Sequence, residues 1–316
     1  MPFPIYALLV LGVNLFVILW GAVVRASGSG AGCGEHWPLC NGDILPQSPA
    51  TATLIEFTHR ATSGIALLLV VALYWWSRRA FPVGHRARTG ALWSLGFICS
   101  EALVGAGLVL LHLVGDDASP LRAIYLAVHL LNTFLLLAAL ALTAHWATHD
   151  APWRRPAFGA APWLLGAGVL AVLVVGMSGA VTALGDTLFP PASLAAGFRE
   201  DASPTAHFLI RLRVLHPVLA LLTGFYLSVM VWQVWRVRPG AVETPWGRRL
   251  TTLVLVQLAV GLSNLLLRAP TALQLAHLLV ADLLWLTLVL FTATALTATP
   301  ARDRVSPAAA DPGATA

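Results

Sequence analysis

Long apolar segments alternate with short polar ones along the whole chain, and each apolar segment is long enough to cross a membrane. A helix needs about 20 mainly apolar residues to span a hydrocarbon core about 30 Å thick. The pattern therefore predicts an all-α membrane protein with eight transmembrane helices. Their expected spans are residues 5–24, 54–77, 91–112, 122–147, 160–184, 207–235, 249–267 and 272–298.

Composition agrees with that pattern and excludes an ordinary soluble domain. Of the 316 residues, 58% are hydrophobic and only 10% are charged. The formal net charge is +5 and every basic residue is arginine, concentrated in short loops. The charge therefore indicates membrane topology and not nucleic-acid binding.

The arginines of alternate loops predict the orientation of the helices. By the positive-inside rule these loops are cytoplasmic, and so are both termini. We expect a multi-pass protein of the plasma membrane whose first segment is a retained helix and not a cleaved signal peptide. The arginines in question are Arg78, Arg79, Arg86, Arg88, Arg154, Arg155, Arg236, Arg238, Arg248, Arg249, Arg302 and Arg304.

The second half of the sequence repeats the first. GMSGAVTALGD matches WGAVVRASGSG, IRLRVLHPVLALLTG matches IEFTHRATSGIALLL, QLAVGLSNLLL matches EALVGAGLVLL, and LAHLLVADLLWL matches AVHLLNTFLLL. We predict two pseudo-symmetric four-helix bundles in the same orientation, comprising residues 1–153 and 154–299. A tail rich in Ala, Pro and Asp, residues 300–316, is expected to be disordered and cytoplasmic.

The repeat brings four histidines to equivalent positions. His216 matches His59, and His277 matches His129. All four are expected one to two and a half turns, roughly 5 to 14 Å, below the outer surface. A lone membrane histidine is usually a hydrogen-bonded structural residue, but paired imidazoles on facing helices are typical haem ligands. The repetition favours haem ligation toward the outer face.

Carboxylates distinguish the two halves. Glu56 lies one helical turn from His59 and aligns with Arg213, whereas Glu101 aligns with Gln257. Chemistry at a carbon atom needs proton acceptors, while holding a redox cofactor does not. The active site is thus expected in the N-terminal half. A structural role remains open for each carboxylate. Glu56 would then only neutralise Arg60, and Glu101 would form a hydrogen bond to a neighbouring helix and not be part of a proton path.

Cys33 and Cys40 lie in the first outer loop, GSGAGCGEHWPLCNGDILP. Oxidised thiols persist on that side of the membrane, so the pair favours a disulfide; free thiols or a metal site with His36 are the alternatives. Arginines near the outer ends of the helices could bind haem propionates or anchor the helices at the interface. These are Arg25, Arg122, Arg211, Arg213 and Arg268.

These motifs together resemble the haem A synthase family, in its bacterial branch with a cysteine pair in the first outer loop. The resemblance covers nearly all of residues 5–298 and rests on GCGEHWPLCNG, EFTHR and the other three histidines. It implies an oxidoreductase that converts the C8 methyl group of haem O to a formyl group by successive hydroxylation, giving haem A for terminal oxidases.

The resemblance also implies roles for individual residues. His216 and His277 would hold a haem b cofactor, and His59 and His129 the substrate haem O. Glu56 would be the catalytic acidic residue, and Cys33 and Cys40 would form a disulfide. Some relatives carry a second cysteine pair in the third outer loop, which this chain lacks.

Expected partners are haem O, the prenyltransferase that makes it, an unidentified electron acceptor and the lipid bilayer. A quinone-linked di-haem electron carrier would also show four such histidines, and a haem transporter or chaperone would bind haem without modifying it. The prenyltransferase activity itself is disfavoured, because the sequence has no pair of aspartate-rich motifs for magnesium diphosphate.

Overall fold

The computed structural model describes residues 1–47, 49–149, 161–237 and 245–297, and most of them are helical. Eight candidate membrane spans occur within these residues, as predicted, each within a few residues of its expected bounds. The predicted tail lies outside the described residues. The helices are α1 (Phe3–Ala26), η1 (Ser29–Ala31), α2 (Thr51–Ala80), α3 (Arg86–Leu110), α4 (Pro120–Trp146), α5 (Ala161–Leu188), α6 (Leu194–Asp201), α7 (Phe208–Leu212), α8 (Leu215–Val237), α10 (Pro245–Leu266) and α11 (Thr271–Thr297).

Local sequence explains where several helices begin and break. The hydroxyl of Ser119 accepts a hydrogen bond from the Arg122 backbone N–H at 3.2 Å, and Pro120 follows at the first helical position of α4. The sixth span was expected as one helix but is interrupted at Arg213 and Val214, between α7 and α8. Pro217 has no N–H to donate to the Arg213 carbonyl, and its ring crowds that carbonyl.

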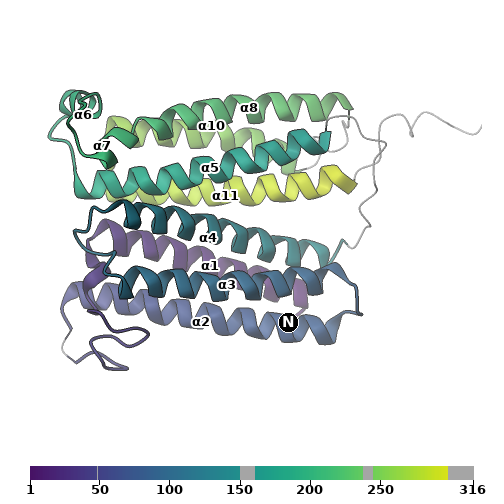
Figure 1. Cartoon of the computed structure of the whole chain (residues 1–316). Helices are drawn as coiled ribbons and strands as arrows, with labels where there is room; N and C mark the ends of the chain where they lie inside the picture. Colours follow the sequence, from purple (N-terminus) through teal and green to yellow (C-terminus); the bar gives the residue numbers. More distant parts are fainter. Residues whose placement is uncertain (48, 150–160, 238–244, 298–316) are drawn as a thin grey trace, which may run out of the picture.

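The first four spans form one four-helix group. α1 packs against α2 and α4, and α3 packs between α2 and α4 (Figure 1). Its core joins buried side chains of all four helices, among them Val10, Leu73, Ile98 and Leu140. The N-terminus lies beside the end of α2, where the rings of Phe3 and Phe81 are 4.9 Å apart.

The remaining spans form a second group in the same arrangement. α5 packs against α8 and α11, and α10 packs between α8 and α11 (Figure 1). The boundary predicted between the halves falls in residues 150–160, outside the described residues.

α4 and α11 join the two groups at the centre of the molecule. In the most apolar stretch of each span, 50% of the residues of α4 and 56% of those of α11 are buried inside the protein. In every other span this buried share is 28% or less. The Phe134 ring stacks on Trp285 at 5.4 Å, and the Trp285 indole donates to the Phe134 carbonyl at 2.6 Å. The bond satisfies a buried indole N–H that would otherwise lie unpaired in an apolar core.

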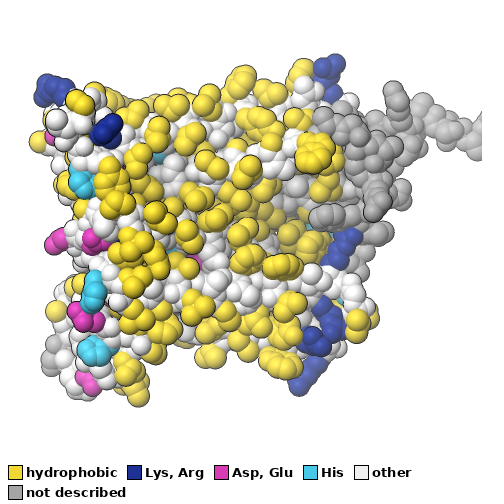
Figure 2. Space-filling view, in the orientation of Figure 1, with side chains coloured by type: hydrophobic (Ala, Val, Ile, Leu, Met, Phe, Trp, Pro, Cys, Tyr) yellow, Lys and Arg dark blue, Asp and Glu magenta, His cyan; other side chains and the backbone are white. Residues whose placement is uncertain are grey.

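The two ends of the molecule differ in charge. Arginine side chains line the end where the N-terminus lies, whereas acidic and histidine side chains, with a few arginines, gather at the other end (Figure 2). The flanks between the ends are mainly apolar in this view. This is the surface expected of a multi-pass membrane protein.

Candidate functional site

The four predicted histidines lie near the end of the molecule opposite the N-terminus. Each follows the start of its span by six to nine residues, at Thr51, Pro120, Phe208 and Thr271. At 1.5 Å per residue this is about 9 to 14 Å along the helix. The histidines in question are His59, His129, His216 and His277.

The two histidines of the C-terminal half face each other closely. The ring centroids of His216 and His277 are 6.2 Å apart, and the ring planes are nearly perpendicular, at 88°. When two imidazoles bind one metal from opposite sides through bonds of about 2 Å, their ring centres lie about 6 Å apart. This separation would suit two imidazoles that hold one iron between them.

Neighbouring polar groups contact both rings of this pair. The Ser178 hydroxyl lies 3.1 Å from His216 Nδ1, which leaves the other ring nitrogen for a metal. The Gln257 amide nitrogen lies 3.2 Å from His277 Nε2. His277 Nδ1 is buried without a hydrogen-bond partner among the described residues. An unpaired buried ring nitrogen is a candidate ligand atom.

Glycines allow three of the rings to lie directly against a neighbouring helix. A Cβ at Gly179 would lie 3.0 Å from His216 Cε1, and one at Gly261 would lie 3.0 Å from His277 Cε1. At Gly21 the corresponding distance to His59 Cε1 is 2.9 Å. These glycines were not predicted as part of the site, although the GAV triplet that contains Gly21 and Gly179 recurs in both halves.

The N-terminal pair is arranged differently. His59 and His129 form no ring contact like that of the C-terminal pair in the described part of the chain. Gly105 holds the place that Gly261 holds in the other half, yet no described atom lies within 4 Å of its potential Cβ. His129 instead lies beside Glu101, with Nδ1 and Oε1 3.5 Å apart.

The described residues contain no group of three or more His, Cys, Asp or Glu side chains that could hold a metal ion. Paired imidazoles are the protein ligands suited to a metal whose other ligands come from a macrocycle. On donor chemistry and ring separation, the residues present fit a haem.

Glu56 lies close to His59 in sequence but is bound to the first outer loop. Its side chain is buried; Oε2 accepts from the Cys33 backbone N–H at 2.7 Å, and Oε1 from Arg60 Nη2 at 2.6 Å. Arg60 also donates to the carbonyls of His36 and Leu39. The Glu56–Arg60 pair thus fixes the loop to α2, which is the structural role that the sequence left open.

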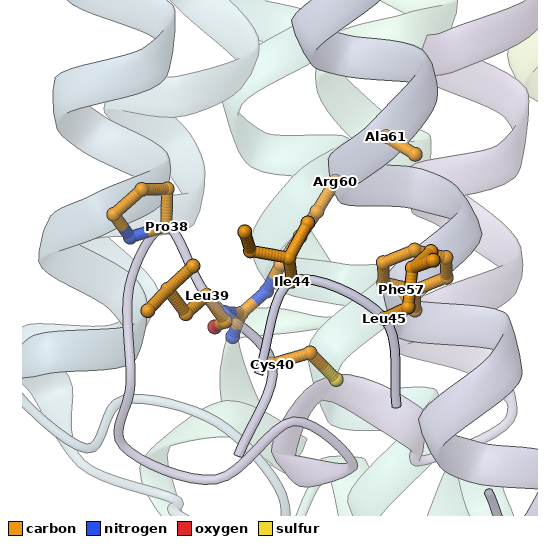
Figure 3. A pocket seen from close by; sticks show the side chains of 8 residues that line it. All are labelled: Pro38, Leu39, Cys40, Ile44, Leu45, Phe57, Arg60 and Ala61. Atoms are coloured by element: carbon orange, nitrogen blue, oxygen red, sulfur yellow. The ribbon is translucent and has the colours of Figure 1, made fainter. Parts of the chain in front are cut away.

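Cys33 and Cys40 form the predicted disulfide. The disulfide loop, residues 33–45, folds back along α2, and the two border a half-open pocket of about 340 Å³. Figure 3 shows the residues that line this pocket, which are Phe57, Arg60 and Ala61 of α2 and, from the loop, Pro38, Leu39, Cys40, Ile44 and Leu45. Phe57 and Ala61 lie on nearly the opposite side of α2 from His59, by a rotation of 100° per residue.

Arg213 holds loop groups of its own half. Its guanidinium contacts Asp201 at 3.0 Å and Asp186 at 3.4 Å, and donates to the Phe189 carbonyl at 3.1 Å. Burial raises the pKa of the Asp201 carboxyl, and the charge of Arg213 opposes that shift.

Other outer-end arginines also contact protein groups. Arg122 donates to the Gly115 and Asp117 carbonyls, and Arg268 donates to the Ala192 carbonyl. For these residues and Arg213, the contacts found stabilise loops. Propionate binding by the outer-end arginines stays a prediction.

Comparison with known proteins identifies the family. The family model described as cytochrome oxidase assembly protein, COX15-CtaA, matches residues 4–289. A protein from Exiguobacterium sibiricum named haem A synthase is 30% identical over 212 residues, covering 67% of this chain and 68% of that protein. One of the same name from Bacillus cereus is 43% identical over 95 residues, 30% of each chain.

A relative with a different name is more similar. A Thermus thermophilus protein named protohaem IX farnesyltransferase is 50% identical over 291 residues, which are 92% of this chain but 48% of that protein. This chain thus spans about half the length of that relative. The match across nearly all eight spans is nevertheless decisive for the family: the chain belongs to the COX15-CtaA family of cytochrome oxidase assembly proteins.

Proposed function

We propose that this chain is a haem A synthase, an oxidoreductase that converts the C8 methyl group of haem O to a formyl group. The observation that carries the proposal is the pairing of four histidines into two unequal sites. In the pair His216 and His277 the ring centroids are 6.2 Å apart, and the rings lie beside neutral polar groups. The other pair has no such ring contact among the described residues and has a carboxylate beside His129. One resident cofactor and one reacting haem suit this difference.

In this proposal the C-terminal half, residues 154–299, holds haem b. His216 and His277 are its ligands, Ser178 orients the His216 ring, and Gly179 and Gly261 make room for the rings. Bound there, haem b supplies one-electron redox chemistry.

The N-terminal half, residues 1–153, takes haem O as substrate through His59 and His129. The open space beside Gly105 supports this assignment. Glu56 is proposed as the catalytic acidic residue. Since both of its oxygens accept hydrogen bonds from Cys33 and Arg60, its catalytic role must be separated by experiment from its role in holding the loop.

The proposed setting is the plasma membrane, with both termini cytoplasmic and the haem sites toward the outer face. The arginines at the N-terminal end of the molecule support this orientation (Figure 2).

The name of the Thermus relative supports a second candidate function, farnesyl transfer to protohaem IX. The match covers less than half of that relative, and this chain has no pair of aspartate-rich motifs for magnesium diphosphate. We therefore propose the farnesyltransferase as a neighbouring enzyme, because the farnesylated haem that it would release is the substrate proposed here.

One reconstitution separates these functions. The purified full-length protein, in membranes with an electron acceptor, is supplied with haem O or with protohaem IX plus farnesyl diphosphate, and the haems are extracted. A haem A synthase forms haem A from haem O and forms no haem O from protohaem. Haem O formation would instead assign the transferase, and two unchanged bound haems would assign an electron carrier.

The resident cofactor is tested by ligand substitution. His216→Ala and His277→Ala should each remove most haem b from the purified protein, since each deletes one of two axial ligands. His59→Ala is the matched control and should retain it. Full haem b with a normal low-spin spectrum in both C-terminal variants would contradict the assignment.

A further inference from the structure

A cluster of polar side chains connects α3 to α4 beside the N-terminal histidine pair. At its centre the Glu101 carboxyl accepts from the Asn132 amide at 2.5 Å and from the Thr133 hydroxyl, and lies 3.5 Å from His129 Nδ1. Ser100 in turn donates to the Asn132 carbonyl oxygen at 2.7 Å. Glu101 is therefore surrounded by donors from the neighbouring helix.

This arrangement is costly unless it serves the site. A carboxylate within a membrane span costs a few kcal/mol, about 2.5 to 3.5 at the helix centre, and such groups usually face a functional cavity. The Glu101 side chain is 19% exposed and the His129 side chain 28% exposed. Gly105 lies one turn along the same face of α3, and no described atom lies within 4 Å of its potential Cβ. The cluster is therefore only partly covered by neighbouring side chains.

We propose that Glu101 is a positioning residue for His129. His129 Nδ1 is buried without a hydrogen-bond partner among the described residues, and the Glu101 carboxyl, 3.5 Å away, can accept its hydrogen bond when Nε2 turns to the iron of the substrate haem. This inference rests on the proposed function and deepens it. A carboxylate on the far nitrogen of a ligating imidazole fixes the tautomer and ring orientation, and it makes the ring a stronger electron donor. Asn132 and Thr133 hold the carboxylate in place.

The other half provides the contrast. Gln257 occupies the position of Glu101, is uncharged, and lies against His277 Nε2 at 3.2 Å. The His277 ring packs against Gly261, whereas no described atom fills the matching space at Gly105. Among the described residues, a carboxylate lies within 4 Å of a ring nitrogen in the N-terminal pair alone. A stronger donor stabilises ferric iron, so Glu101 lowers the reduction potential of the haem at this site.

The test compares the wild-type chain with Glu101→Gln, which gives the N-terminal half the side chain found in the other half. The purified full-length protein in lipid nanodiscs is titrated with protohaem, which probes the N-terminal site without depending on turnover. We expect the variant to bind this haem about 10- to 100-fold more weakly, the usual effect of losing such a partner. The midpoint potential of that haem should rise, while the haem at the C-terminal site keeps its spectrum and potential.

Two further variants keep the inference testable if Glu101→Gln does not fold. Thr133→Val removes one donor to the carboxylate and should shift affinity and potential in the same direction by a smaller amount. Gln257→Glu, the reciprocal change, should alter only the C-terminal haem. Wild-type affinity and potential at the N-terminal site in a folded Glu101→Gln or Thr133→Val protein would overturn the proposal. Because these readouts need no conversion, they are independent of whether haem A is formed from haem O.

Discussion

At the scale of single residues, Glu56 has two candidate roles that one pair of variants separates. It binds the Cys33 backbone and Arg60, so its loss loosens the disulfide loop whatever its part in the chemistry. Arg60 makes the other half of the same contact and donates to the loop carbonyl of Leu39. A variant of Arg60 is therefore a structural control for a variant of Glu56.

We predict that Glu56→Gln abolishes haem A formation while haem b is retained, because it removes the charge but keeps the size. Arg60→Gln should loosen the loop to a similar degree, by about 1 to 3 kcal/mol for a charged hydrogen bond, yet keep substantial conversion. The measurement is the amount of haem A formed, divided by the amount of haem b that the protein retains. Limited proteolysis measures how well ordered the loop is in each variant. Equal loss of conversion in both variants would assign Glu56 a structural role alone.

Gly261 and Gly105 offer a second comparison at this scale, because they occupy equivalent positions and differ only in surroundings. A Cβ at Gly261 meets the His277 ring at 3.0 Å, whereas one at Gly105 meets no described atom within 4 Å. Gly261→Ala should therefore displace His277 and weaken the low-spin haem b spectrum, and Gly105→Ala should leave it unchanged. Identical spectra for both variants would show that close packing at Gly261 is not needed.

At the scale of elements, the disulfide loop is stabilised by more than its covalent bond. The Thr53 hydroxyl donates to the Gly32 carbonyl at 2.8 Å, and Glu56 and Arg60 add further contacts. These bonds join the loop to the first turns of α2, away from the C-terminal haem ligands. Loss of the disulfide should thus act locally.

We predict that replacing Cys33 and Cys40 together by Ser increases proteolysis of the loop but leaves the haem b spectrum intact, since a cross-link acts mainly by constraining the unfolded segment. Unreduced mass mapping of the wild-type protein is the companion measurement and should show one linked peptide. Two alkylatable thiols in the air-exposed protein, or loss of haem b in the double variant, would contradict this account. Cys99→Ser, a change at the free cysteine, is the control.

At the scale of the whole molecule, Arg25 connects the two halves. From the end of α1 it donates to the Ala183 carbonyl at 2.6 Å, to the Thr187 hydroxyl at 2.5 Å and to the Gln274 side chain at 2.8 Å. All three acceptors belong to α5 and α11. The contact complements the Phe134–Trp285 packing that joins α4 to α11 deeper in the molecule.

We predict that Arg25→Ala lowers the free energy of unfolding by about 1 to 3 kcal/mol, the usual cost of unpairing buried acceptors. Arg211→Ala changes an exposed arginine and should stay within about 0.5 kcal/mol of wild type. Thermal unfolding in one detergent compares the two. An unchanged midpoint for Arg25→Ala, with weaker haem retention, would instead favour propionate binding by Arg25.

Much of this molecule follows from its sequence, because the deciding features are local or repeated. A run of about 20 apolar residues must be a helix in lipid, where the backbone has no other hydrogen-bond partners. The eight spans were predicted on that basis and are confirmed. The Cys33–Cys40 disulfide, predicted from the place of the two cysteines in an outer loop, is confirmed as well. The internal repeat also indicated which histidines correspond, although their roles as haem ligands stay predictions.

The tertiary structure alone decided how these side chains meet, because rotation and crossing of helices determine which faces touch. It placed His216 and His277 at 6.2 Å, put a glycine against three of the four rings, and turned Glu101 toward His129. It also directed Glu56 to the backbone of a loop 23 residues away in sequence. A hydrophobic pattern specifies that a helix spans the membrane, but distances of 3 Å between side chains depend on packing across helices that are far apart in the chain.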